Sequence, residues 1–170
     1  MNRPILYLFI GAPGAGKTTI AKLIAERTGA AHLWADRERH KLFDRPTHSR
    51  AESMRLYDYL NQKAEELLKS GQSVVFDTNF NFYDDRQKLR QIAEEAGAEV
   101  VIIWLTTPNE VARQRSVHAP ETRNGYMYEM TDEQFNSIVS KLEPPRKDEK
   151  VIKIDGSKFD KEQAVAILGI

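Results

Sequence analysis

The chain has 170 residues, enough for one domain with a substantial hydrophobic core, and we expect a single domain over residues 1–170. Its 25 acidic residues balance its 25 lysines and arginines, so no net charge attracts it to nucleic acid or to an anionic membrane. The absence of cysteine excludes disulfides, thiolate catalysis and cysteine-ligated metals. Since the N-terminal apolar run is too short for a signal peptide or a membrane span, we expect a cytoplasmic protein.

A short apolar run opens the chain and leads through a glycine-rich loop into residues with helical spacing. Ile5–Ile10 has the length of a buried strand. Ile20, Leu23 and Ile24 recur as they would on one face of a helix. The segment between them is a complete G-x-x-x-x-G-K-[ST] phosphate-binding loop, made of Gly11, Ala12, Pro13, Gly14, Ala15, Gly16, Lys17, Thr18 and Thr19.

The residue types of this loop suit a nucleoside triphosphate. Gly11, Gly14 and Gly16 allow the main chain to approach phosphate oxygens and to point N–H groups at them. Lys17 would place a positive charge on the β and γ oxygens, and the Thr18 hydroxyl would join the shell of Mg²⁺. The alternative is a glycine-rich turn that binds nothing. The order of strand, loop and helix favours nucleotide binding, with ATP and Mg²⁺ as expected cofactors.

Apolar strands and amphipathic helices alternate along the rest of the chain. We expect strands at Ala31–Trp34, Gln72–Phe76, Glu99–Leu105 and Val151–Ile154. We expect one helix at Ala51–Ser70 and another that begins at a cap of Asp84 or Asp85 and ends at Ala96. Three more helices should begin after a Thr107 cap, at a Thr131 capping box and at Asp160, and the second of these three should end before Pro144. This alternation predicts a parallel sheet covered on both faces, with ligands at the carboxyl ends of its strands.

Acidic residues follow two of the expected strands. After Trp34, Asp36 and Arg39 would share one face if the segment is helical. Asp36 could accept the proton of an acceptor hydroxyl, while Arg39 holds a phosphate. The alternative is that Asp36 only caps a helix and pairs with Arg39.

The strand that ends at Phe76 is followed by Asp77, as in a Walker B strand whose aspartate holds Mg²⁺ directly or through water. No glutamate follows Asp77, so the base of motor ATPases is missing from its usual place. Thr78 and Asn79 are either a turn that bonds to its own backbone or part of an acceptor site.

Arginines follow the fourth strand. Arg113 and Arg115 lie in an expected helix at the start of a lid of about residues 113–130. An arginine over the phosphates would stabilise transition-state charge and help to exclude water. The alternative is an ordinary amphipathic helix with solvated arginines.

These residues together resemble the small P-loop (AAA_33-like) kinases, and most closely the kinase domain of 5′-hydroxyl polynucleotide kinases. The resemblance rests on Gly11–Thr19, the Asp36/Arg39 pair, the run Asp77–Asn81 and the helix with Arg113 and Arg115. It implies a three-layer α/β P-loop NTPase fold with a five-stranded parallel sheet in the order 2-3-1-4-5 and a lid segment.

The resemblance also implies roles for individual residues. Asp36 would be the general base, Arg39 would contact phosphate, and Arg115, or alternatively Arg113, would touch the ATP phosphates. A second basic lid residue is often found in that family, and this sequence offers His118 in its place. With the reasoning above, catalytic roles fall to Lys17, Asp36, Arg39 and Arg115.

Three functions remain open at this point. The first is an ATP-dependent kinase that phosphorylates a hydroxyl, with a polynucleotide 5′-OH as the leading acceptor, bound by Asp36, Arg39, Asp77 and Asn79. Residues 36–55 hold six lysines and arginines against four acids, a small basic surplus. The second is a small-molecule kinase for a sugar, nucleoside or antibiotic, which the neutral overall charge suits. The third is a non-catalytic module that ATP gates.

Overall fold

The computed structural model of the protein describes residues 2–117 and 130–170. Its five strands form one parallel sheet in the order β2-β3-β1-β4-β5, which confirms the expected fold and strand order. The strands are β1 Ile5–Ile10, β2 Ala31–Trp34, β3 Val74–Asn79, β4 Glu99–Leu105 and β5 Val151–Ile154. The helices are α1 Lys17–Thr28, α2 Ala35–Leu42, α3 Arg50–Lys69, α4 Tyr83–Glu95, α5 Asn109–Ser116, α6 Asp132–Lys141 and α7 Lys161–Leu168.

Helices cover both faces of this sheet and produce three layers. The central strand β1 alternates between two cores: Leu6, Leu8 and Ile10 pack with α3 and α4, whereas Tyr7 and Phe9 pack with α1 and α7. All five side chains are buried because β1 lies between β3 and β4. The loop that follows β1 is therefore carried by the most enclosed strand of the molecule.

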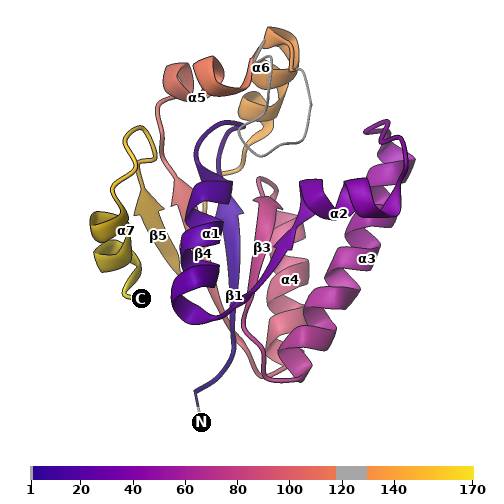
Figure 1. Cartoon of the computed structure of the whole chain (residues 1–170), viewed down its shortest axis with the longest axis vertical. Coiled ribbons are helices and arrows are strands. Elements are labelled where there is room, and N and C mark those ends of the chain that lie inside the picture. The colour runs from indigo at the N-terminus through magenta and orange to yellow at the C-terminus, as the bar shows by residue number, and fades with distance from the viewer. Residues whose placement is uncertain (1, 118–129) are drawn as a thin grey trace.

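Helices α5 and α6 lie apart from these layers. They stack above the carboxyl ends of the strands, while α2 stands beside the strands on the other side of the loop after β1 (Figure 1). A small apolar cluster of Ala12, Ala112, Met130 and Phe135 joins α5 and α6 to that loop. Among the helices of the described ranges, none is long and apolar enough to cross a membrane.

Strand β3 differs from its expected bounds. It begins at Val74 and continues through Asp77 to Asn79, so the predicted turn at Thr78 and Asn79 is wrong. The pairing of β3 with β1 is irregular between Tyr7 and Phe9, which lets two extra residues of β3 fit beside β1. This irregularity was not visible in the sequence because it depends on the neighbouring strand.

Two expected helix caps are also wrong. Helix α4 is preceded by Phe82 rather than capped by Asp84 or Asp85, and its first N–H, from Tyr83, donates to the Glu143 carboxylate at 3.1 Å. Thr107 does not cap α5, since its hydroxyl donates to the Ala15 carbonyl at 2.8 Å. In α4 a distant carboxylate takes the place of the local cap, whereas in α5 the Thr107 hydroxyl bonds to a distant carbonyl and no side chain caps the helix.

The two remaining caps are confirmed. Thr131 and Gln134 form the expected capping box of α6, and the Asp160 side chain caps α7 by accepting the N–H of Gln163. These caps are formed within one helical turn, which is why a local pattern was enough to predict them.

Candidate active site

The glycine-rich loop after β1 adopts an anion-binding shape. Gly14 and Gly16 have positive φ values of 79° and 109°, a region that suits glycine. Gly16 is also the N-cap of α1, and no side chain caps that helix end. The first N–H groups of α1 are therefore left for a ligand with negative charge, and the helix dipole favours the same charge.

Lys17 lies folded back on the loop. Its ammonium donates to the carbonyl oxygens of Gly11 at 3.2 Å and Ala12 at 2.8 Å. Burial of the ammonium lowers the pKa of Lys17 to about 8, against the opposing pull of the Asp77 and Asp36 carboxylates. A phosphate that approached the loop would stabilise the charged form of Lys17, which burial disfavours.

Two other segments press on the outer side of the loop. A Cβ at Gly14 would lie 2.4 Å from the Ala112 carbonyl of α5, and a Cβ at Gly156 would lie 2.2 Å from the Ala15 carbonyl. Thr107 links this contact, because its hydroxyl donates to the Ala15 carbonyl and accepts the N–H of Gly156, each at 2.8 Å. The segments after β4 and β5 thus fix the shape of the loop.

Thr18 and Asp77 lie together at the start of α1. The Thr18 hydroxyl donates to one carboxylate oxygen of Asp77 at 3.3 Å, and the His32 Nε2 lies 2.9 Å from the other. A hydroxyl and a carboxylate are hard oxygen ligands of the kind Mg²⁺ prefers. Within residues 2–117 and 130–170 no group of three or more histidine or acidic side chains could hold a metal by itself. These two residues fit Mg²⁺ that is shared with nucleotide phosphates.

Asp36 stands in the first turn of α2, directly after β2. Protein atoms that displace water around its carboxyl raise the pKa of Asp36, and the negative charge of Asp77 raises it further. His48, Arg39 and Lys17 act in the opposite direction. The carboxyl of Asp36 therefore lies within electrostatic reach of both the loop lysine and the Asp77 carboxylate.

The structure removes the alternative role for Asp36. The N-cap of α2 is Trp34, with no side-chain cap, so the prediction of Asp36 as a cap is wrong. Nor does Arg39 pair with it: the buried Arg39 guanidinium binds the carboxylate of Glu52 and donates to the Ser53 hydroxyl at 3.1 Å. Arg39 is thus held by α3, and its charge is already balanced.

Glu52 organises the loop of residues 43–49, which joins α2 to α3. Its carboxylate accepts the backbone N–H groups of Thr47 at 2.8 Å and His48 at 2.9 Å in addition to the Arg39 guanidinium. Burial favours the neutral acid, but these hydrogen bonds outweigh it and lower the pKa of Glu52 to about 2. His48 is held in the left-handed region with φ 57°, beside Asp36 and Arg39.

The two arginines of α5 have different partners. Arg113 turns to α6, where it binds Asp132 at 2.9 Å and Asn136 at 2.6 Å. Arg115 turns to the phosphate-binding loop and donates to the Gly14 carbonyl at 3.2 Å. Its other terminal nitrogen donates to the Ser157 carbonyl at 2.7 Å. Only Arg115 of this pair contacts the loop.

Two sets of predicted residues remain. Asn79 ends β3 and is exposed. His118 and residues 118–129 of the predicted lid lie outside the described residues.

Sequence reasoning missed Glu52, whose partners Thr47, His48 and Arg39 precede it in the chain, and Asn81, whose partner Gly11 is 70 residues away. The available signal for Asn81 was its place in the run that starts at Asp77.

Comparisons with known proteins agree with this architecture. Similar structures include a candidate kinase from Chloroflexus aurantiacus J-10-fl, with a TM-score of 0.78, 19% identity and coverage of 99% of this chain and 98% of that one. Another is the Mycobacterium tuberculosis APS kinase CysC in complex with AMPPNP and APS, with a TM-score of 0.69, 22% identity and full coverage, 100%, of both chains. A chain of the Pnkp1/Rnl/Hen1 RNA repair complex has a TM-score of 0.69 and 21% identity, and the match covers 84% of this chain and 45% of that one. At these identities the likeness establishes the fold.

Sequence relatives add the family. An uncharacterised protein of Mycobacterium tuberculosis (strain ATCC 25618 / H37Rv) is 30% identical over 124 residues, which is 66% of this chain and 25% of the relative. A Mycobacterium bovis protein matches equally well, so the chain spans about a quarter of the length of the curated relatives it matches. The model of the AAA_33 family, an AAA domain, matches residues 6–145, from β1 to the segment after α6. The chain therefore belongs to the AAA_33 family of AAA domains.

Proposed function

We propose that this protein is a kinase that transfers the γ-phosphate of ATP to a hydroxyl group. The observation that carries the proposal is the placement of Asp36 just after the carboxyl end of β2, at the same edge of the parallel sheet as the loop with Lys17, the residue that would hold the transferring phosphate. A nucleotide-binding module without chemistry has no need of a carboxylate there. The raised pKa of Asp36 also suits a group that takes up a proton during the reaction.

The residues would divide the work as follows. N–H groups of the loop and of the first turn of α1 would bind the β and γ phosphates, with the Lys17 ammonium placed on them. Thr18 and Asp77 would hold Mg²⁺, which neutralises phosphate charge when it is bound. Asp36 would orient the acceptor hydroxyl and accept its proton, while Arg115 would stabilise charge on the transferring group.

The leading acceptor is a polynucleotide 5′-hydroxyl. It is supported by the resemblance of the run from Asp77 to Asn81 to polynucleotide kinases, and by the similarity of the fold to a chain of an RNA repair complex. The exposed Asn79 at the end of β3 would contact this acceptor.

A small-molecule hydroxyl is the second candidate. The specific observation that favours it is the buried ion pair of Arg39 with Glu52, because an arginine that is already neutralised offers little to a phosphate backbone. The balanced charge of the whole chain points the same way.

The experiment that tests these proposals is phosphate transfer from γ-labelled ATP with Mg²⁺ to a panel of acceptors. The panel contains 5′-OH DNA and RNA oligomers, nucleosides, sugars and aminoglycosides, with 5′-phosphorylated oligomers as the matched negative controls. We expect label on a hydroxyl acceptor, and none with Lys17→Ala. Nucleotide binding without transfer to any acceptor would favour the gated module instead.

A further inference from the structure

The Asn81 side chain is paired with the main chain at the first residue of the phosphate-binding loop. Its carbonyl oxygen accepts the N–H of Gly11 at 3.0 Å, and its amide nitrogen donates to the Gly11 carbonyl at 3.1 Å. Asn81 is almost completely buried, with 2% of its surface exposed. A carboxamide can satisfy both backbone groups of one residue because it carries a donor and an acceptor side by side.

The same Gly11 carbonyl also accepts from Lys17. Both carbonyls that hold the Lys17 ammonium have a second donor: Gly11 has the Asn81 amide, and Ala12 has the N–H of Ala15 at 3.1 Å. If Lys17 moves to a phosphate, neither buried carbonyl is left without a hydrogen bond. A buried carbonyl that lost its last hydrogen bond would oppose the movement of Lys17, because buried polar groups without partners are costly.

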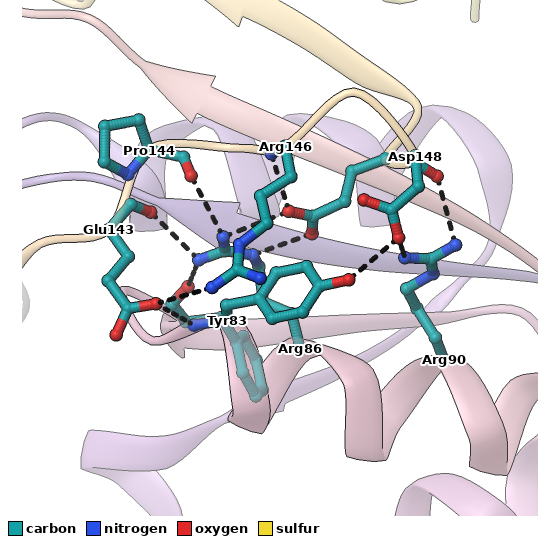
Figure 2. Close-up of polar contacts among 9 residues, drawn as sticks. Tyr83, Arg86, Arg90, Glu143, Pro144, Arg146 and Asp148 are labelled. Atoms are coloured by element: carbon teal, nitrogen blue, oxygen red, sulfur yellow. Dashed lines mark hydrogen bonds and ion pairs between the residues drawn. The ribbon is translucent and has the colours of Figure 1, made fainter.

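Asn81 is itself fixed by a buried arginine. The Phe80 carbonyl, one residue before it, accepts from Arg86 at 2.7 Å, and the Asn81 carbonyl accepts the N–H of Glu143 at the same distance. Arg86 is fully buried and binds the Glu149 carboxylate with two nitrogens, at 2.8 and 3.1 Å. Figure 2 shows the Arg86 guanidinium, which comes from α4, surrounded by acceptors that include the carbonyls of Glu143 and Pro144 in the segment before β5. The backbone at Asn81 is therefore held in place by contacts that do not involve Lys17.

We propose that Asn81 is a positioning residue for nucleotide binding, which keeps the Gly11 carbonyl paired while Lys17 transfers from the loop to the phosphates. The proposal rests on the proposed nucleotide binding but not on phosphate transfer or on the acceptor. It concerns a residue that touches no nucleotide, and it acts through Gly11 and Lys17.

Two variants separate this role from a structural one. Asn81→Ala removes both hydrogen bonds and should weaken Mg-ATP binding about tenfold while it lowers the melting temperature. Asn81→Asp keeps the acceptor for the Gly11 N–H, but its second oxygen faces the Gly11 carbonyl. The Lys17 ammonium can offset this repulsion while it lies on the loop in the free protein. It can no longer do so once it has moved to a phosphate. Asn81→Asp should therefore be the more stable of the two variants and the weaker in binding Mg-ATP.

Ser73 offers a matched control, because it lies just before β3 whereas Asn81 lies just after it. The Ser73 hydroxyl accepts the N–H of Ile5 at 2.9 Å, so Ser73→Ala removes a comparable link between β3 and β1 far from the loop. Calorimetric titration with Mg-ATP and thermal melts of the full chain measure all four proteins. We expect wild-type affinity in Ser73→Ala. Wild-type affinity in Asn81→Asp and in every Asn81→Ala sample that folds would overturn the positioning role. Failure of the wild type itself to bind Mg-ATP would instead overturn the proposed function, and this inference with it.

Discussion

The two sides of the candidate active site are built differently. On the nucleotide side, the shape comes from one continuous run, Gly11–Thr19, with glycines where the backbone requires them. On the side proposed for the acceptor, the shape of residues 43–49 comes from the Glu52 carboxylate, which gathers two backbone N–H groups and Arg39. The first kind of site is built from residues adjacent in sequence and is braced by the segments after β4 and β5, whereas the second depends on a single side chain. Variants on each side should therefore fail in different ways.

The largest expected effect is on the acceptor side. Asp36→Asn keeps the size of the side chain but removes the base, so kcat should fall about 10²–10⁴-fold while ATP affinity and melting temperature stay near those of the wild type. Because the pKa of Asp36 is raised, the acidic fall of kcat/KM in the wild type should occur at a higher pH than for an ordinary aspartate. Steady-state kinetics across pH measure both. Near-normal turnover by Asp36→Asn would move the search for the base to Asp77.

The next effect tests where the two sides meet. Arg115→Ala should lower kcat by about 10²-fold and weaken ATP binding much less, if its guanidinium stabilises charge that develops in the transition state. Arg113→Ala is the matched variant, since it removes an arginine of the same helix that contacts Asp132 and Asn136 of α6. The opposite pattern, with the larger kcat loss in Arg113→Ala, would assign the phosphate contact to Arg113.

A smaller effect should appear in the pH dependence on the nucleotide side. The free protein holds the pKa of Lys17 near 8, and bound phosphates stabilise the ammonium, so ATP affinity should fall as pH rises through 8. Between pH 7.5 and pH 9 we expect about a tenfold loss of affinity in calorimetric titrations. The residual affinity of Lys17→Arg should be flat over this range because arginine stays charged. A flat wild-type profile would mean that Lys17 is not the group linked to binding.

The smallest expected effect on nucleotide binding comes from Glu52→Gln. The pKa of Glu52 lies at about 2 in the folded chain, below its ordinary value of 4.5, so its stabilising contribution is present above pH 4.5 and is lost as pH falls toward 2. Glu52→Gln should lower the melting temperature at pH 7 by several degrees and reduce its acid dependence. It should also raise the KM for the acceptor and leave that for ATP unchanged.

The control for Glu52→Gln is Glu65→Gln, on the same helix. Glu65 pairs only with the exposed Lys69, four residues on, so its loss should barely change the melting temperature. Equal melting curves for Glu52→Gln and Glu65→Gln would contradict the organising role of Glu52.

The same contrast explains what the sequence could predict. The parallel sheet, the phosphate-binding loop and the Thr131 capping box were predictable because each depends on residues close in sequence or on the alternation of strands and helices. The strand order was predicted only through the resemblance to P-loop kinases. The end of β3 was misjudged because Asp77 continues the pairing with β2, and Asn79 pairs with β1 beyond an irregularity in the register. The roles of Glu52 and Asn81 could not be inferred, since an acidic residue and an amide in polar segments have no local pattern that names a partner. For Asn81 that partner is 70 residues away.

The contact between Gly156 and the loop has a consequence for how variation in this protein should be interpreted. At position 156 even a methyl group would have to displace the Ala15 carbonyl, which lies 2.2 Å from where its Cβ would be. The clearance on the outer side of the loop is thus too small for any side chain at position 156. A substitution there would be recorded as a defect in nucleotide binding, although Gly156 belongs to the segment after β5 and is far from the loop in sequence. In screens of variants, loss of binding should therefore be mapped onto both sides of the loop before a residue is assigned to the ligand.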